Sequence, residues 1–159
     1  MSRAARRCEP STYIRVVSRA APPGYIAGLG GNVSQAITRG VRVTVRPEFL
    51  AHQSDPKGGL WMFAYHVQIE NGGPEPVQLV ARHWVITDAT GRVEDVRGPG
   101  VIGEQPVLAP GQVYDYTSGC PLPTSMGTMH GTYQMLTQRG ERFDATIAPT
   151  VRARGLARA

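Results

Sequence analysis

The stretch RHWVITDATGRVEDVRGPGVIGEQPVLAPG, residues 82–111, decides the fold. It opens as an alternating strand, turns at residues 88–91 and returns as a short second strand over residues 93–96. Residues 98–103 then show the spacing GxGxxG, which usually precedes a helix and holds a phosphate. Two prolines within residues 104–111 lead into more strand instead, so this loop is predicted to belong to an all-β domain.

A two-residue hydrophobic period recurs along the rest of the chain, as expected where side chains alternate across a pleated strand. Residues 61–69 alternate most clearly, and residues 128–137 place Met129, Tyr133 and Met135 on one face. In residues 78–88 strict alternation puts Val80, Trp84 and Ile86 on one side and Leu79, Ala81 and Val85 on the other. About seven such strands, separated by turn residues, predict an antiparallel β-sandwich. They cover residues 41–46, 61–70, 78–88, 93–96, 112–118, 128–137 and 143–147.

Charge is distributed unevenly along the 159 residues. Residues 1–40 hold six arginines and one acid, and residues 150–159 hold three arginines and no acid, whereas residues 41–149 are mildly acidic. We therefore expect a basic, mostly disordered extension over residues 1–40, one domain over residues 41–149 and a basic tail over residues 150–159. Because the basic charge lies in the tails, the domain is not expected to bind nucleic acid specifically.

The sequence indicates a cytoplasmic protein without a membrane partner. No apolar run approaches the ~20 residues that span a bilayer, and the N-terminus lacks the apolar block of a secretory signal. The Arg-rich start resembles a transit peptide in composition, and an overlong start is the other interpretation. Cys8 and Cys120 form no CxxC pair and are predicted to be reduced.

Seven short motifs follow one another in the order found in ApaG proteins. They are QSxP at 53–56, FAY at 63–65, QLxxRHWxIxD at 78–88, GxGVxGxQP at 98–106, LxPG at 108–111, YTSG at 116–119 and GxMxGxY at 127–133. The chain therefore resembles the ApaG family over about residues 41–148. This resemblance implies a fold like fibronectin type III or immunoglobulin domains, a protein-binding role, and a connection with cobalt resistance and magnesium efflux in bacteria. The family's closing run is replaced by IAPTVRARG at 147–155, which leaves full pairing of the last strand open.

The glycine loop is the first candidate site. Arg97, Gly98, Gly100, Gly103 and Gln105 are the residues that would hold the pyrophosphate of a nucleotide. Glycines allow backbone N–H groups to approach phosphate oxygens, and an arginine adds charge-assisted hydrogen bonds. Pro99 has no N–H group and no helix dipole follows. The alternative is a conformationally special loop that links two strands.

An exposed sheet face is the second candidate site. Trp84 is predicted to be a core anchor, with Arg82 on the same side or near the sheet's rim, and His83 on the opposite face. Arg82 and His83 are therefore the predicted interaction surface. We expect a non-enzymatic module that binds an unidentified protein, and a nucleotide-binding or pyrophosphate-binding protein is the alternative.

Metal binding and catalysis find little support in the sequence. The histidines at 52, 66, 83 and 130 lack compact ligand spacing, so no metal site and no cofactor are expected. No catalytic residue is assigned, because no nucleophile motif occurs and the acids at 88, 94 and 95 are most simply solvated. Glu104 is the acid next to the glycine loop, and nothing nearby in the sequence supports it as a general base.

Overall fold

The computed structural model describes residues 17–20 and 33–153, which form ten strands and two short 3-10 helices. The strands are β1 (Val17–Ala20), β2 (Ser34–Thr38), β3 (Val41–Phe49), β4 (Trp61–Asn71), β5 (Val77–Asp88), β6 (Val93–Pro99), β7 (Val107–Leu108), β8 (Gln112–Leu122), β9 (Met126–Thr137) and β10 (Arg142–Ala153). The helices η1 (Ala51–Gln53) and η2 (Pro56–Gly58) lie between β3 and β4. In the described ranges, no helix is long and apolar enough to cross a membrane.

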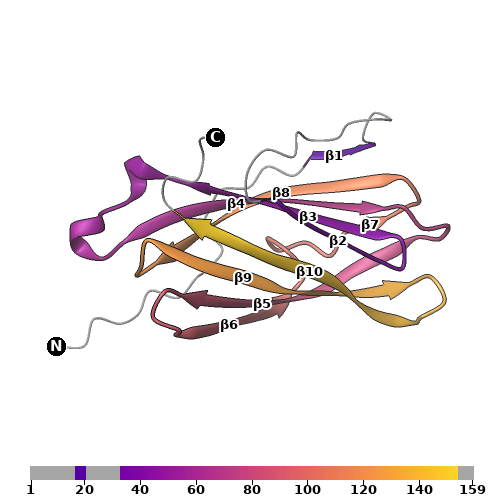
Figure 1. The fold of residues 1–159 in the computed structure, drawn as a ribbon. Helices are drawn as coiled ribbons and strands as arrows, with labels where there is room; N and C mark the ends of the chain where they lie inside the picture. Colours follow the sequence, from indigo (N-terminus) through magenta and orange to yellow (C-terminus); the bar gives the residue numbers. More distant parts are fainter. Residues whose placement is uncertain (1–16, 21–32, 154–159) are drawn as a thin grey trace.

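The strands form two antiparallel sheets that pack face to face (Figure 1). The first sheet has the order β1-β8-β4-β3-β2. The second sheet has the order β10-β9-β5-β6, and β7 pairs with β5 as well. The predicted antiparallel β-sandwich is therefore confirmed. All seven predicted strands are present, and the short strands β1, β2 and β7 are additional.

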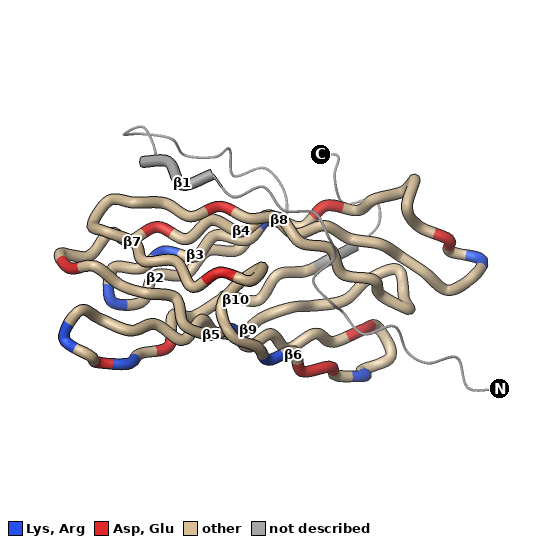
Figure 2. The backbone as a smooth tube through the Cα atoms, turned by 180° about the vertical axis from the view of Figure 1, so that it is seen from behind, with Lys and Arg blue, Asp and Glu red and all other residues tan. Residues whose placement is uncertain are grey.

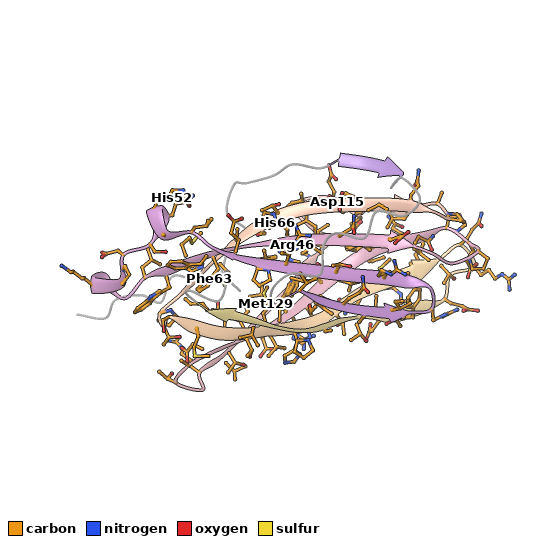
Figure 3. The ribbon with its side chains drawn as sticks, turned by 45° about the horizontal axis from the view of Figure 1, so that its top comes forward. Arg46, His52, Phe63, His66, Asp115 and Met129 are labelled. Carbon is orange, nitrogen blue, oxygen red and sulfur yellow. The ribbon has the colours of Figure 1, made fainter. Side chains whose placement is uncertain are left out.

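The core lies between the sheets and is built from the alternating side chains of both. Phe63 and Ile69 of β4 are fully buried, and Met129, Tyr133 and Met135 of β9 are at most 1% exposed. Figure 3 shows Phe63 and Met129 between the two layers. Burying an apolar side chain of this size stabilises a fold by about 1.5–3 kcal/mol relative to leaving it in water. The two-residue hydrophobic period in the sequence therefore corresponds to the side chains that the fold buries.

One face assignment in β5 is wrong because the strand contains a β-bulge. The register against β9 shifts between Leu79 and Ala81, so Val80 is an extra residue on β5. Leu79 is fully buried and Trp84 is 2% exposed, although strict alternation placed them on opposite faces. The bulge changes the parity of the strand and thus brings both side chains into one core.

The domain boundaries also differ from the prediction. Residues 34–38, placed in the extension, form β2 and pair with β3, because the Arg39-Gly40 turn closes a tight hairpin with φ values of 48° and 83°. At the other end, β10 pairs with β9 as far as Ala153, across a register shift between Ile147 and Thr150. The last strand is therefore paired despite the unusual closing sequence. The rest of the predicted extension and tail lies outside the described residues.

Cys120 lies on the core side of β8 and is fully buried. It is disulfide-bonded, so the expectation of two reduced thiols is wrong. The expectation rested on the absence of a CxxC pair, which says nothing about contacts between cysteines far apart in sequence.

Candidate functional site

An exposed polar face on β5 and β6 carries the second candidate site. His83 lies opposite Arg97, and Val85 lies opposite Asp95, in the antiparallel register of these strands. We call these four residues the β5–β6 face. Residues directly opposite one another project to the same side of a sheet. Trp84 and Ile86, which alternate with His83 and Val85 along β5, are buried, so the β5–β6 face points away from the core.

His83 contacts a carboxylate of this face. Its Nε2 atom lies 2.7 Å from Oδ1 of Asp95. The side chain of His83 is 21% exposed and that of Asp95 is 57% exposed. The neighbouring strand continues the face, since Thr132 and His130 of β9 lie opposite His83 and Val85. His83 therefore points outward, as predicted, and is held by a carboxylate.

The glycine loop lies along one edge of the second sheet rather than at the end of the sandwich. β6 pairs with β5 over Ala81–Thr87, and β7 pairs with the start of β5 at Val77 and Gln78. The loop between β6 and β7 therefore interrupts one edge beside β5. Val101 from this loop is 1% exposed and joins the core cluster. The loop closes the space between the sheets at this edge.

The loop is a tight turn whose amides are largely used within the chain. Val101 N donates to Glu104 O at 2.8 Å, and Glu104 N donates to Val101 O at 2.9 Å. The two central residues, Ile102 and Gly103, have φ values of 46° and 78°, as a type I′ turn requires. Gly100 N donates to Val80 O at 2.7 Å. No helix follows, as the prolines predicted.

Gly100 and Gly98 are required by close packing within the chain. A Cβ atom on Gly100 would lie 2.0 Å from Glu104 O, and the residue has φ +56°. A Cβ atom on Gly98 would lie 3.0 Å from the guanidinium of Arg82. Gly103 is different, because nothing lies within 4 Å of its Cβ position. Only Gly103 of the three is thus open to an incoming group.

Arg82 holds the glycine loop and does not share a surface with His83. Its Nη1 atom donates to the carbonyl oxygens of Pro99 and Gly100, both at 2.9 Å. It lies on the same side of β5 as Trp84, as predicted, but at the edge where the loop crosses. The structure therefore separates the two residues of the predicted interaction surface onto opposite faces of β5.

The other predicted ligand residues are also dispersed. Arg97 lies on the β5–β6 face, opposite His83, and is exposed. Gln105 uses its side-chain amide to donate to Val80 O at 2.9 Å. Val80, the bulge residue, thus accepts from both Gly100 and Gln105 and anchors both ends of the loop.

Glu104 contacts a tyrosine of the opposite sheet. Tyr114 of β8 donates a hydrogen bond from its hydroxyl to Oε2 of Glu104 at 2.8 Å. Burial, and then the neighbouring carboxylate, raise the pKa of Tyr114 well above the usual tyrosine value. Sequence reasoning missed this pair, because the two residues meet only when the sheets are stacked.

Two further tyrosines lie in the core. The hydroxyls of Tyr116 and Tyr133 form a hydrogen bond with each other. Tyr133 packs edge-to-face against Trp84, with ring centroids 6.0 Å apart. Burial raises the pKa of both tyrosines well above the usual value, so both remain protonated in the folded chain.

The histidines do not converge on a common site. His66 lies on the outer face of the first sheet, with Asp115 nearby and His52 at the end bearing η1 (Figure 3). His66 contacts Glu48 through Nε2 at 2.9 Å and Thr117 through Nδ1 at 2.8 Å. Among the residues that the structure describes, no three metal-binding side chains are grouped closely enough to hold an ion.

Comparison with known proteins identifies the family of this chain. The family model described as the ApaG domain matches residues 51–137, and protein ApaG of Rhodospirillum centenum is 60% identical over 111 residues. This chain belongs to the ApaG family. The alignment with that relative covers 70% of this chain and 85% of the relative. Protein ApaG of Afipia carboxidovorans is 55% identical over 113 residues, which cover 71% of this chain and 87% of that protein.

A solved structure shares the fold of this chain. The crystal structure of the putative ApaA protein from Bordetella pertussis superposes with a TM-score of 0.71 at 49% sequence identity. The match covers 72% of this chain and 94% of that one. The glycine loop and the β5–β6 face both lie inside the residues matched by the ApaG domain model.

Proposed function

We propose that this ApaG domain is a non-enzymatic protein-binding module and that the β5–β6 face meets the partner. The observation that carries the proposal is the His83–Asp95 pair beside Arg97 on one exposed sheet face. Strands hold side chains more precisely than loops do. Arginine is enriched among the residues that dominate binding energy at protein interfaces. A rigid polar face with an arginine at its margin suits recognition of a folded protein surface.

The internal bonding of the glycine loop supports the same function. The amides of Gly100, Val101 and Glu104 already donate to carbonyl oxygens of the chain. Arg82 is likewise committed to the carbonyls of Pro99 and Gly100. A loop in this state offers a fixed shape, which limits the cost of ordering on binding.

Nucleotide binding is the second candidate, because one part of the loop remains open. Gly103 is exposed, has φ +78° and has nothing within 4 Å of its Cβ position. Backbone amides of consecutive turn residues can bind an anion. Titration with ATP, GTP and diadenosine tetraphosphate tests this candidate. Saturable binding that is lost in Gly103→Asp and kept in His83→Ala would assign the function to the loop instead of the face.

Affinity capture with the full chain tests the binding module. The double variant His83→Ala, Arg97→Ala removes two of the four side chains of the β5–β6 face, and His52→Ala removes an exposed histidine of η1 as a matched control. We expect one protein to be retained by the wild-type chain and by the control, and to be lost from the double variant. Retention by all three chains, or by none, would contradict the proposed surface.

The connection with cobalt and magnesium that the resemblance implies would act through the partner in this proposal. The test is to measure cation sensitivity of cells that carry the double variant in place of the wild-type gene. We expect the double variant to reproduce the phenotype of a deletion, whereas His52→Ala does not.

A further inference from the structure

β6 is the open edge of the second sheet. It ends the strand order β10-β9-β5-β6, and no strand in the described residues pairs with its other side. The opposite edge of that sheet is joined to the first sheet, where Thr146 N donates to Thr38 Oγ1 at 3.1 Å. In the first sheet, β8 is paired along part of its edge with β1. An open edge presents backbone donors and acceptors on which another strand can form.

The hydrogen bonds at the two ends of the β5–β6 ladder fix which residues of β6 face outward. Gly100 N donates to Val80 O at 2.7 Å, and Asp88 N donates to Arg92 O at 3.0 Å. Backbone groups in an antiparallel pair point toward the partner at every second residue. The backbone N–H and C=O groups of the even-numbered residues of β6 therefore point toward β5. The backbone groups of Val93, Asp95 and Arg97 point away from it.

The side chains at these outward positions carry opposite charges two residues apart. Asp95 and Arg97 are both exposed, and Val96 between them packs against the core. Figure 2 shows acidic and basic positions close together along β6. An acid and a base flanking one central residue are complementary to themselves under a two-fold rotation, which is the symmetry of most protein dimers.

We propose that β6 pairs antiparallel with β6 of a second copy of this chain, about a two-fold axis at Val96. Asp95 of one copy then lies opposite Arg97 of the other, and the two exchange backbone hydrogen bonds. The reciprocal pair forms on the other side of the axis. The result is one continuous sheet that runs through both copies.

The charges select this register over its neighbours. A shift by two residues in one direction places Asp95 opposite Asp95, and a shift in the other direction places Arg97 opposite Arg97. Like charges directly opposite one another destabilise a strand pair, whereas opposite charges stabilise it. Pro99 has no N–H group and ends the ladder at the glycine loop. The short edge and the proline limit the contact to a weak, reversible association.

Sedimentation equilibrium of the purified full chain tests the proposal, from about 10 μM to about 1 mM, a range in which weak complexes dissociate. We expect a monomer–dimer equilibrium that weakens with added salt. Asp95→Lys should weaken the dimer on the order of tenfold, because both ion pairs become repulsive. The double variant Asp95→Arg, Arg97→Asp restores opposite charges and should restore the dimer. Like Asp95→Lys, it removes the carboxylate that contacts His83, so loss of that contact cannot explain a difference between the two variants.

Asp144→Lys is the matched control, since Asp144 is an exposed acid on β10 of the same sheet, away from β6. Its dimer constant should equal that of the wild-type chain. A chain that stays monomeric over the whole range overturns the proposal. So does a dimer that Asp95→Lys leaves unchanged, or one that the double variant fails to restore.

Amide hydrogen exchange locates the contact. The amides of Asp95 and Arg97 should exchange more slowly as the concentration rises, whereas that of Val96 is already paired with β5 and should not change. Concentration-dependent protection elsewhere, without protection at these two residues, would assign the dimer to another surface. The inference goes beyond the proposed binding function. It uses the purified chain alone, so its failure would leave the capture experiment unaffected.

Discussion

The hydroxyl of Tyr114 lies 2.8 Å from a carboxylate oxygen of Glu104, and this hydrogen bond joins the first sheet to the glycine loop of the second. The buried side chain of Val101 and this hydrogen bond both hold the loop against the opposite sheet. The loop is thus part of the packing of the sandwich. Substitutions in it should therefore change the stability of the fold, and their effect on binding has to be measured after that change is known.

Tyr114→Phe should lower the free energy of unfolding by about 1–2 kcal/mol, since a hydrogen bond to a charged group is lost. Glu104→Gln keeps an acceptor at this position and should lower it less. Urea denaturation of the two variants and the wild-type chain measures the difference. Equal stability of Tyr114→Phe and the wild-type chain would mean that the bond contributes nothing net.

The buried tyrosines should make the fold sensitive to alkali. The pKa values of Tyr114, Tyr116 and Tyr133 are raised above the unfolded value of 10.0, mainly by burial. The folded state therefore holds these protons more tightly, and the resulting stability is complete below pH 10 and is lost as the pH rises above it. Absorbance of tyrosinate near ~295 nm should show three tyrosines that ionise only together with unfolding. Their ionisation in a chain that is still folded would contradict the burial.

Gly100→Ala and Gly103→Ala separate backbone strain from steric overlap. Gly103→Ala should cost about 1–2 kcal/mol, because an L residue is strained at positive φ but meets no neighbour. Gly100→Ala adds an overlap with Glu104 O at 2.0 Å and should be clearly more destabilising. Thermal melts of both variants provide the comparison. Equal melting temperatures would show that the loop moves aside at no cost.

Acid stability should depend on the turn after β5. Hydrogen bonds, first from the Thr90 hydroxyl, hold the pKa of Asp88 below its usual value. This contribution is present above the unfolded pKa of 3.8 and is lost as the pH falls through the folded pKa. Thr90→Val should raise the pKa of Asp88, as followed by NMR titration, and should move the acid transition to higher pH. The exposed control Thr128→Val should leave both unchanged.

The N-terminal limit of the domain can be tested by truncation. A chain that starts at Asn32 keeps β2, including the 2.6 Å contact between Ser34 and Thr150. A chain that starts at Arg39 loses β2 and the bond from Thr146 N to Thr38. Both truncated chains lack residues 1–31, and the second should melt several degrees below the first because only the second lacks β2. A second truncation that melts with the first would show that β2 adds no stability.

The sequence predicted those strands in which apolar side chains alternate, such as β4 and β9, because alternation reports burial directly. It missed β2, whose buried residue is Ser34 and whose Ile37 is 60% exposed. It also missed β7, which has only two residues. Strands that are stabilised by pairing and side-chain hydrogen bonds leave no hydrophobic period to detect.

The site could be predicted only in part for a related reason. The outward direction of His83 follows from the burial of Trp84, its neighbour in sequence. The contacts of Arg82 with Pro99 and of Tyr114 with Glu104 depend on strand register and on sheet stacking. Neither relationship is encoded within one local segment, so these contacts become visible only in three dimensions.

The extra residue Val80 in β5 determines both which side chains of this strand face the core and how the glycine loop is anchored. Deleting Val80 would make the strand regular while leaving Trp84 inside, but would remove the carbonyl group that receives Gly100 and Gln105. A chain that lacks this residue should therefore hold the loop between β6 and β7 less firmly. Grafts of foreign loops onto this scaffold should keep Val80, whose carbonyl group can anchor a new loop at both ends.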